Sequence, residues 1–206
     1  MRQNVTQSAT VAVLAAVVGT LSFCTSGHSD KPAPGGGGGG PVTEVDPVQR
    51  GGYIVATSGC HDCHSPKVMT PKGPVPDTSR LLSGHPAGST LPPMDPKATR
   101  PGNWVLMAPD ITAFVGPWGG SFAANLTSDS ATGIGAWTLE NFVNAMKTGK
   151  HMGHPGGRDI LPPMPWPQLA RMTDEDLRAV FAYLKSLPPV HNRVPQPVAP
   201  GDVGKK

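Results

Sequence analysis

The 206-residue chain is poor in cysteine and carries little net charge. Its formal charge is only +3 at pH 7, and no basic stripe interleaved with aromatic residues occurs in it. Because nucleic acids are bound chiefly through clustered Lys and Arg side chains, we expect no nucleic-acid partner. The sequence also lacks a paired acid and base in a pocket pattern and lacks a nucleophile motif. We therefore expect a protein that is not itself an enzyme.

The few cysteines are informative because of their spacing. Cys60 and Cys63 belong to the run Cys-His-Asp-Cys-His, which ends at His64. Cys-x-x-Cys-His is the spacing at which c-type haem is attached. Each thiol can form a thioether to one vinyl group of the porphyrin, and the adjacent histidine then serves as the proximal iron ligand. The motif occurs once, so the sequence predicts a single covalent haem c, a group that most often moves electrons.

Two other interpretations of the cysteine pair have to be compared with haem. A redox dithiol is expected in a βαβ setting, and no buried β-branched strand leads into Cys60. A zinc site needs two further ligands, for which His85, His151 and His154 are the candidates. The last two flank glycine and proline rather than lying on a finger helix.

The N-terminus has the pattern of an export signal over residues 1–23. A single charge, Arg2, precedes an apolar run at residues 11–18 that is too short to span a bilayer comfortably. The segment ending at Cys24 resembles a bacterial lipobox, although Phe23 stands where a small residue is usual. We expect a periplasmic or other extracytoplasmic protein that is tethered to the membrane as a lipoprotein through Cys24. Ordinary signal cleavage and an uncleaved anchor remain alternatives.

The segment after the signal, residues 24–45, contains six consecutive glycines and is rich in proline. Such a sequence cannot build a core, and it predicts a flexible tether. We expect a folded domain over residues 46–193 and a mobile, proline-rich tail over residues 194–206.

Three helices are predicted inside the domain. One follows the N-cap Asp46 and covers residues 48–57, and a second follows Thr138 and ends before Gly149. The third begins after Thr173, carries three acidic residues in its first turn, and ends at the Pro-Pro pair 188–189. Residues 66–120 show no sustained period, and we expect an ordered loop with short helical turns at 78–82 and 109–114.

The order of these elements resembles that of class I cytochromes c. The shared features are a helix entering Cys-x-x-Cys-His, a loop-rich middle, a methionine-bearing loop and a C-terminal helix with Phe181 and Tyr183. The segments Ile-Leu-Pro-Pro-Met-Pro-Trp at 160–166 and Gly-Pro-Trp-Gly at 116–119 are similar to those of a bacterial monohaem subgroup, as are 125–138 and 172–190. The resemblance covers residues 46–193. It implies a mainly α, class I cytochrome c fold in which a long loop-rich insertion wraps one haem and the terminal helices cross closely, at Gly51 or Gly52.

The second axial ligand of the iron is expected to be one of the eight methionines. Met164 is favoured, because it lies shortly before the last helix and because Pro162, Pro163 and Pro165 stiffen its loop. Met94, Met107 and Met152 lie in loops, and spacing alone leaves them open. The three histidines named above are a further alternative. A thioether ligand raises the reduction potential, since soft sulfur favours Fe(II).

The sequence thus predicts haem binding by Cys60, Cys63, His64 and Met164, with His64 and Met164 on the iron. The expected function is one-electron transfer in an extracytoplasmic chain, with a redox partner protein as the other participant. The alternative is an electron-accepting cytochrome subunit of a membrane-associated dehydrogenase complex. A gas sensor or peroxidase would need an open distal position, against which Met164 argues.

Overall fold

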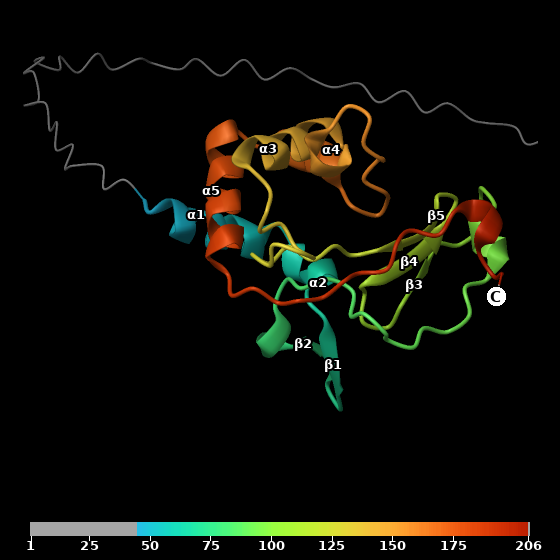
Figure 1. Cartoon of the computed structure of the whole chain (residues 1–206). Coiled ribbons are helices and arrows are strands. Elements are labelled where there is room, and N and C mark those ends of the chain that lie inside the picture. The colour runs from blue at the N-terminus through green and yellow to red at the C-terminus, as the bar shows by residue number, and fades with distance from the viewer. Residues whose placement is uncertain (1–44, 206) are drawn as a thin grey trace, which may run out of the picture. The chain divides into compact units, whose positions relative to one another are not determined.

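The computed structural model describes residues 45–205 (Figure 1). The expected export signal, Cys24 and almost the whole of the expected tether lie outside these residues. None of the helices found between residues 45 and 205 has the length and apolar content needed to cross a membrane.

Two consecutive helices deliver the cysteine motif. α1 (Pro47–Thr57) begins at the N-cap Asp46, whose side chain accepts a hydrogen bond from the amide of Val48 at 3.3 Å. The chain then passes through Gly59 in the left-handed conformation, with φ of 70°. α2 (Cys60–His64) follows at once and contains the whole motif. The predicted first helix is confirmed, and the motif itself forms a short helix rather than a loop.

The C-terminal helix α5 (Asp174–Ser186) packs across α1, as the resemblance implied. A Cβ atom placed on Gly51 would lie 2.0 Å from the carbonyl oxygen of Ala179, so only glycine allows this approach. Thr173 caps α5 as predicted. The main core surrounds the crossing and is formed by buried side chains of α1, α3, α5 and two loops, namely Val55, Leu82, Ile134, Phe142, Leu177, Val180 and Leu184.

The remaining helices lie together on one side of this pair (Figure 1). α3 (Leu139–Thr148) opens with a capping box between Thr138 and Asn141 and ends at Gly149, as predicted. A single 3-10 turn, η3 (His151–Gly153), and a loop lead to α4 (Trp166–Leu169), which packs on α3.

The middle of the chain contains strands, which the sequence did not predict. β1 (Lys67–Thr70) and β2 (Gly73–Pro76) form a hairpin, and η1 (Thr78–Arg80) follows where a helical turn was expected. After η2 (Pro96–Thr99), the strands β3 (Leu106–Met107), β4 (Ala113–Gly116) and β5 (Gly119–Phe122) form an antiparallel sheet.

The helical turn expected at 109–114 is wrong, because the last two residues of that segment belong to β4 and the others form a turn and a bend. Phe114 and Val115 are buried there, and cross-strand packing stabilises such side chains in an extended chain. Gly119 adopts a φ of 93° in the reversal to β5. The secondary structure is therefore mixed, with helices around small sheets.

The segment after residue 193, expected as a mobile tail, is packed on this sheet in the structure. Val198 and Gly120 exchange two backbone hydrogen bonds of 2.9 Å. η4 (Pro200–Asp202) follows, and Val203 is 5% exposed in a small second core with Ala98 and Val115. The bare backbone of Gly120 explains the contact, since a larger side chain there would meet Val198.

Candidate functional site

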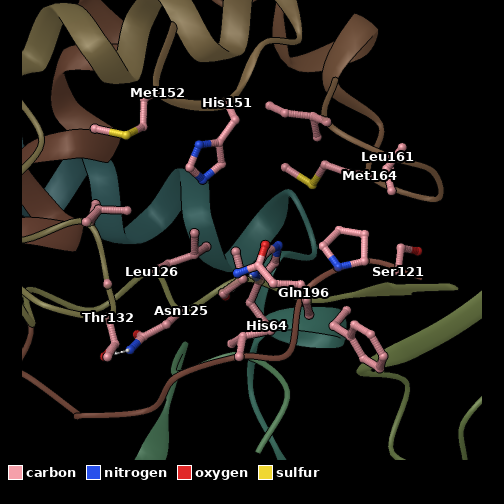
Figure 2. A pocket seen from close by; sticks show the side chains of 18 of the residues that line it. His64, Ser121, Asn125, Leu126, Thr132, His151, Met152, Leu161, Met164 and Gln196 are labelled. Atoms are coloured by element: carbon pink, nitrogen blue, oxygen red, sulfur yellow. Dashed lines mark hydrogen bonds between the residues drawn. The ribbon is translucent and has the colours of Figure 1, made fainter. Parts of the chain in front are cut away.

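A cavity of about 450 Å³ lies between the α3 and α4 region, the β4–β5 sheet and the C-terminal segment. Its lining is mainly apolar, and the polar side chains in it include Asn125, Thr132 and Gln196 (Figure 2). This volume lies in the range typical of cofactor sites. The lining includes His64 and Met164, which are a hundred positions apart in the chain.

His64 is oriented by the backbone of the loop after β5. Its side chain is buried, and Nδ1 lies 2.7 Å from the carbonyl oxygen of Ala124. Because a carbonyl oxygen only accepts, Nδ1 must carry the proton, which leaves the lone pair on Nε2. Burial lowers the pKa of His64, which favours the neutral ring. A neutral imidazole whose other nitrogen donates to a carbonyl is the usual state of a metal-ligating histidine.

Met164 lies in the proline-rich loop before α4, and its sulfur points into the cavity (Figure 2). The Met164 amide donates to the carbonyl oxygen of Leu161 at 3.3 Å. The hydroxyl of Ser121 on β5 donates to the carbonyl oxygen of Pro162 at 2.7 Å. The first bond closes a turn within the methionine loop and the second holds the loop against the sheet, so the sulfur is presented by a supported backbone.

The two cysteines share α2 with His64 but do not line the cavity themselves. Cys60 and His64 are four positions apart and Cys63 is three from Cys60, so all three side chains project from one side of the helix. Neither thiol is in a disulfide. Burial raises the pKa of both thiols, to which the carboxylate of Asp62 adds. A redox dithiol requires the opposite shift, and this interpretation is therefore disfavoured.

Most of the competing ligands are placed elsewhere. Met94 packs in the second core beside Val198, while Met69 and Met107 are exposed. His85 engages both ring nitrogens, at 2.7 Å from Thr112 Oγ1 and 2.9 Å from Ser89 Oγ. His154 is exposed and is not part of the lining.

Met146, Met152 and His151 do line the cavity. Met146 packs on the core as well as facing the cavity. For zinc, the part of the chain from 45 to 205 brings no three His, Cys, Asp or Glu side chains together as a metal cluster.

The charged side chains at the cavity are both cationic. Arg158 and Arg193 line it, and no Asp or Glu among the described residues does so. Burial lowers the pKa of Arg158, and its Nη1 donates only to the carbonyl oxygen of Asp159, at 3.2 Å. Haem carries two carboxylates, so an apolar cavity with a basic edge, an oriented imidazole and a thioether fits that group. The sequence did not predict a role for either arginine, because neither belongs to a recognisable motif.

Three further polar or aromatic side chains lie in or near the cavity wall. Trp118 donates from Nε1 to Ser121 Oγ at 3.0 Å, and Trp137 forms part of the cavity wall. The amide of Asn125 donates to the carbonyl oxygen of Val190 at 2.8 Å, and its Oδ1 accepts from the amide of Thr127 at 3.0 Å. Asn125 is therefore a turn residue whose side chain connects the chain after α5 to the loop after β5, which lines the cavity.

No family model matches the chain. It is 37% identical over 136 residues to the alcohol dehydrogenase (quinone) cytochrome c subunit of Gluconobacter oxydans, a match covering 66% of this chain and 20% of the relative. It is 27% identical over 171 residues to the gluconate 2-dehydrogenase cytochrome c subunit of Pantoea cypripedii, covering 83% and 27%. The fructose dehydrogenase cytochrome subunit of Gluconobacter japonicus is 35% identical over 72 residues, covering 35% and 14%. The chain thus spans at most about a quarter of the length of these relatives.

The motif, the fold and the relatives together identify the class. The chain is a c-type cytochrome, and it is similar to the cytochrome c subunits of dehydrogenases.

Proposed function

We propose that this protein is a one-electron carrier with a single haem c, attached through Cys60 and Cys63 and ligated by His64 and Met164. The observation that carries the proposal is the cavity that the oriented imidazole of His64 and the thioether of Met164 both line (Figure 2). In its finer description the fold is that of a class I cytochrome c, although of residues 66–120, the expected insertion, only Phe114 lines the cavity.

When bound, haem c supplies a reversible Fe(II)/Fe(III) couple. The protein's own residues set its properties. The Ala124 carbonyl fixes the ring of His64, while the Met164 sulfur favours the reduced state. The apolar lining excludes water and so lowers the reorganisation that accompanies a change of charge.

The electron donor is inferred from the relatives' names. Since these relatives are cytochrome subunits of dehydrogenases, we propose that the chain accepts electrons from a dehydrogenase partner. A free shuttle between other redox proteins is the second candidate, and the absence of substrate chemistry in the sequence is compatible with both. Co-purification with a flavin- or quinone-containing subunit would separate them.

The location follows from the same proposal. Haem attachment and the N-terminal pattern support an extracytoplasmic protein, and Cys24 would carry the lipid anchor. Replacing Cys24 with Ser should move the protein out of the membrane fraction. A variant that stays wholly in the membrane fraction would rule out lipidation as the anchor.

The test of the central proposal is a redox titration of the purified protein together with its pyridine haemochrome spectrum. We expect one covalently bound haem, a one-electron couple at positive potential, and a ferric iron that binds cyanide only slowly. An iron that is open to cyanide as isolated would contradict the proposed ligation.

A further inference from the structure

His151 extends into the same cavity as Met164, and its imidazole has no hydrogen-bond partner among the described residues. The ring packs edge-on against Trp137, with the ring centroids 5.6 Å apart and 80° between the planes. Within residues 45–205 neither ring nitrogen of His151 makes a hydrogen bond, whereas His85 uses both of its nitrogens and His64 uses one. Both nitrogens of this half-buried imidazole are therefore available to bind a group in the cavity.

The backbone of His151 is held by other contacts than those that support Met164. Its amide donates to the carbonyl oxygen of Arg158 at 2.9 Å. Lys150 and Asp159 close the base of the same loop through a backbone bridge and an ion pair of 2.5 Å. Met164, by contrast, is supported through Ser121 on the sheet. A change at the sulfur therefore leaves the position of His151 intact.

The two side chains approach the cavity from the same side. Figure 2 shows His151 and Met164 entering it from the loop region after α3, with His64 opposite them. Imidazole binds haem iron in either oxidation state, and it does so through a nitrogen lone pair that His151 has available.

We propose that His151 is the reserve sixth ligand of the iron, which binds when the Met164 thioether is absent. In the haem-loaded protein a bond from a ring nitrogen of His151 to the iron would take the place of the bond from the Met164 sulfur, with no change in the oxidation state of the iron. This proposal rests on the function proposed above. Its consequence is a haem that stays six-coordinate and closed to small molecules, but at a lower potential, because imidazole favours Fe(III) more than thioether does.

The test uses the haem-loaded protein and four variants: Met164→Ala, the double variants Met164→Ala/His151→Ala and Met164→Ala/His154→Ala, and His151→Ala alone. His154 is the matched control, because it lies three residues from His151, is exposed and does not line the cavity. The readouts are the ferric spin state by optical and electron paramagnetic resonance spectroscopy and the rate of cyanide binding.

We expect Met164→Ala to be low-spin, and the double variant without His151 to be high-spin and to bind cyanide at least tenfold faster. Met164→Ala/His154→Ala should behave like Met164→Ala, and His151→Ala should keep the thioether band. A high-spin Met164→Ala variant, or a low-spin double variant without His151, overturns the reserve role. Failure of the proposed function would show earlier, in the unmodified protein, as missing covalent haem or a missing thioether band.

Discussion

Met164 shows how much a single side chain can set in this protein. Replacing it with His should abolish the near-infrared charge-transfer band of the ferric methionine-ligated haem and should lower the reduction potential, because imidazole stabilises Fe(III). Optical spectra and a redox titration check both effects. Met107→His is the control, since Met107 is 59% exposed and lies away from the cavity. Persistence of the band in Met164→His would disprove the assignment.

Arg158 should act on the haem through its charge rather than through a bond to iron. Loss of a positive charge beside the cavity disfavours the reduced haem and so lowers the reduction potential. We expect this effect to be smaller than that of replacing the Met164 thioether. We expect Arg158→Gln to lower the reduction potential by a few tens of millivolts, where about 59 mV is a tenfold change in the ferrous-to-ferric ratio. Arg100→Gln, an exposed arginine outside the cavity lining, should leave the potential unchanged. Equal shifts of the reduction potential in both variants would show an effect of net charge and would contradict a specific role of Arg158.

His85 makes a pH-dependent contribution to stability. It is 1% exposed, and burial lowers its pKa, an effect that the Asp110 carboxylate partly offsets. The folded protein therefore holds the neutral ring, so this contribution is complete above the unfolded pKa of about 6.5 and is lost as the pH falls below it. Urea unfolding between pH 8 and pH 5 should show a smaller loss of stability in His85→Gln than in the parent. Contributions of the other histidines are the same in both proteins and cancel in the comparison. An equal loss of stability in the variant and the parent would show that His85 makes no pH-dependent contribution.

At the scale of elements, the crossing of α1 and α5 depends on one glycine more than on its neighbour. A methyl group on Gly51 would meet the backbone of Ala179, whereas one on Gly52 would meet the ring of Tyr183 at 3.1 Å. A ring can move and a helix backbone cannot. Gly51→Ala should cost about 1–3 kcal/mol or more in the free energy of unfolding. Gly52→Ala should be near neutral, since the gain in helix propensity of up to about 1 kcal/mol offsets the crowding. Denaturant titration of the two variants checks the contrast, which equal costs would contradict.

At the scale of the whole molecule, the C-terminal segment closes one side of the cavity. Residues 193–197 line it, and Val198 and Val203 attach the segment to the sheet and the second core. Deleting residues 194–206 should therefore destabilise the fold by about 2–4 kcal/mol, from the burial of Val203 and two backbone hydrogen bonds. It should also lower the potential by admitting water. Thermal unfolding and redox titration measure the two effects.

Deleting residues 204–206 is the matched control for that truncation. It removes the exposed ion pair between Lys205 and Asp202, which contributes little, and keeps Val203. The short deletion should behave like the parent protein. If the long deletion also did so, the segment would have no part in closing the cavity.

The sequence predicted the parts of the fold whose signals are local. Capping residues and apolar spacing located α1, α3 and α5, because a helix is specified by neighbours within four positions. The strands were missed because each has only two to four residues in a segment rich in Gly and Pro, so no alternating pattern could be recognised. The bridge between Gly120 and Val198 in addition joins segments far apart in the chain. The segment after residue 193 is proline-rich and has no period, so its local sequence did not predict that it would pair with Gly120.

By itself the sequence determined the chemistry of the motif: two thiols and a histidine at the spacing that attaches haem, and a methionine in a stiff loop. Only the tertiary structure brought Met164 into the cavity of His64, tied the ring of His64 to Ala124, and placed Arg158 and His151 beside them. Attachment is a matter of spacing along a few residues, and sequence records it. Axial ligation and the charge around the cavity depend on contacts between distant segments, which form only when the chain buries its core.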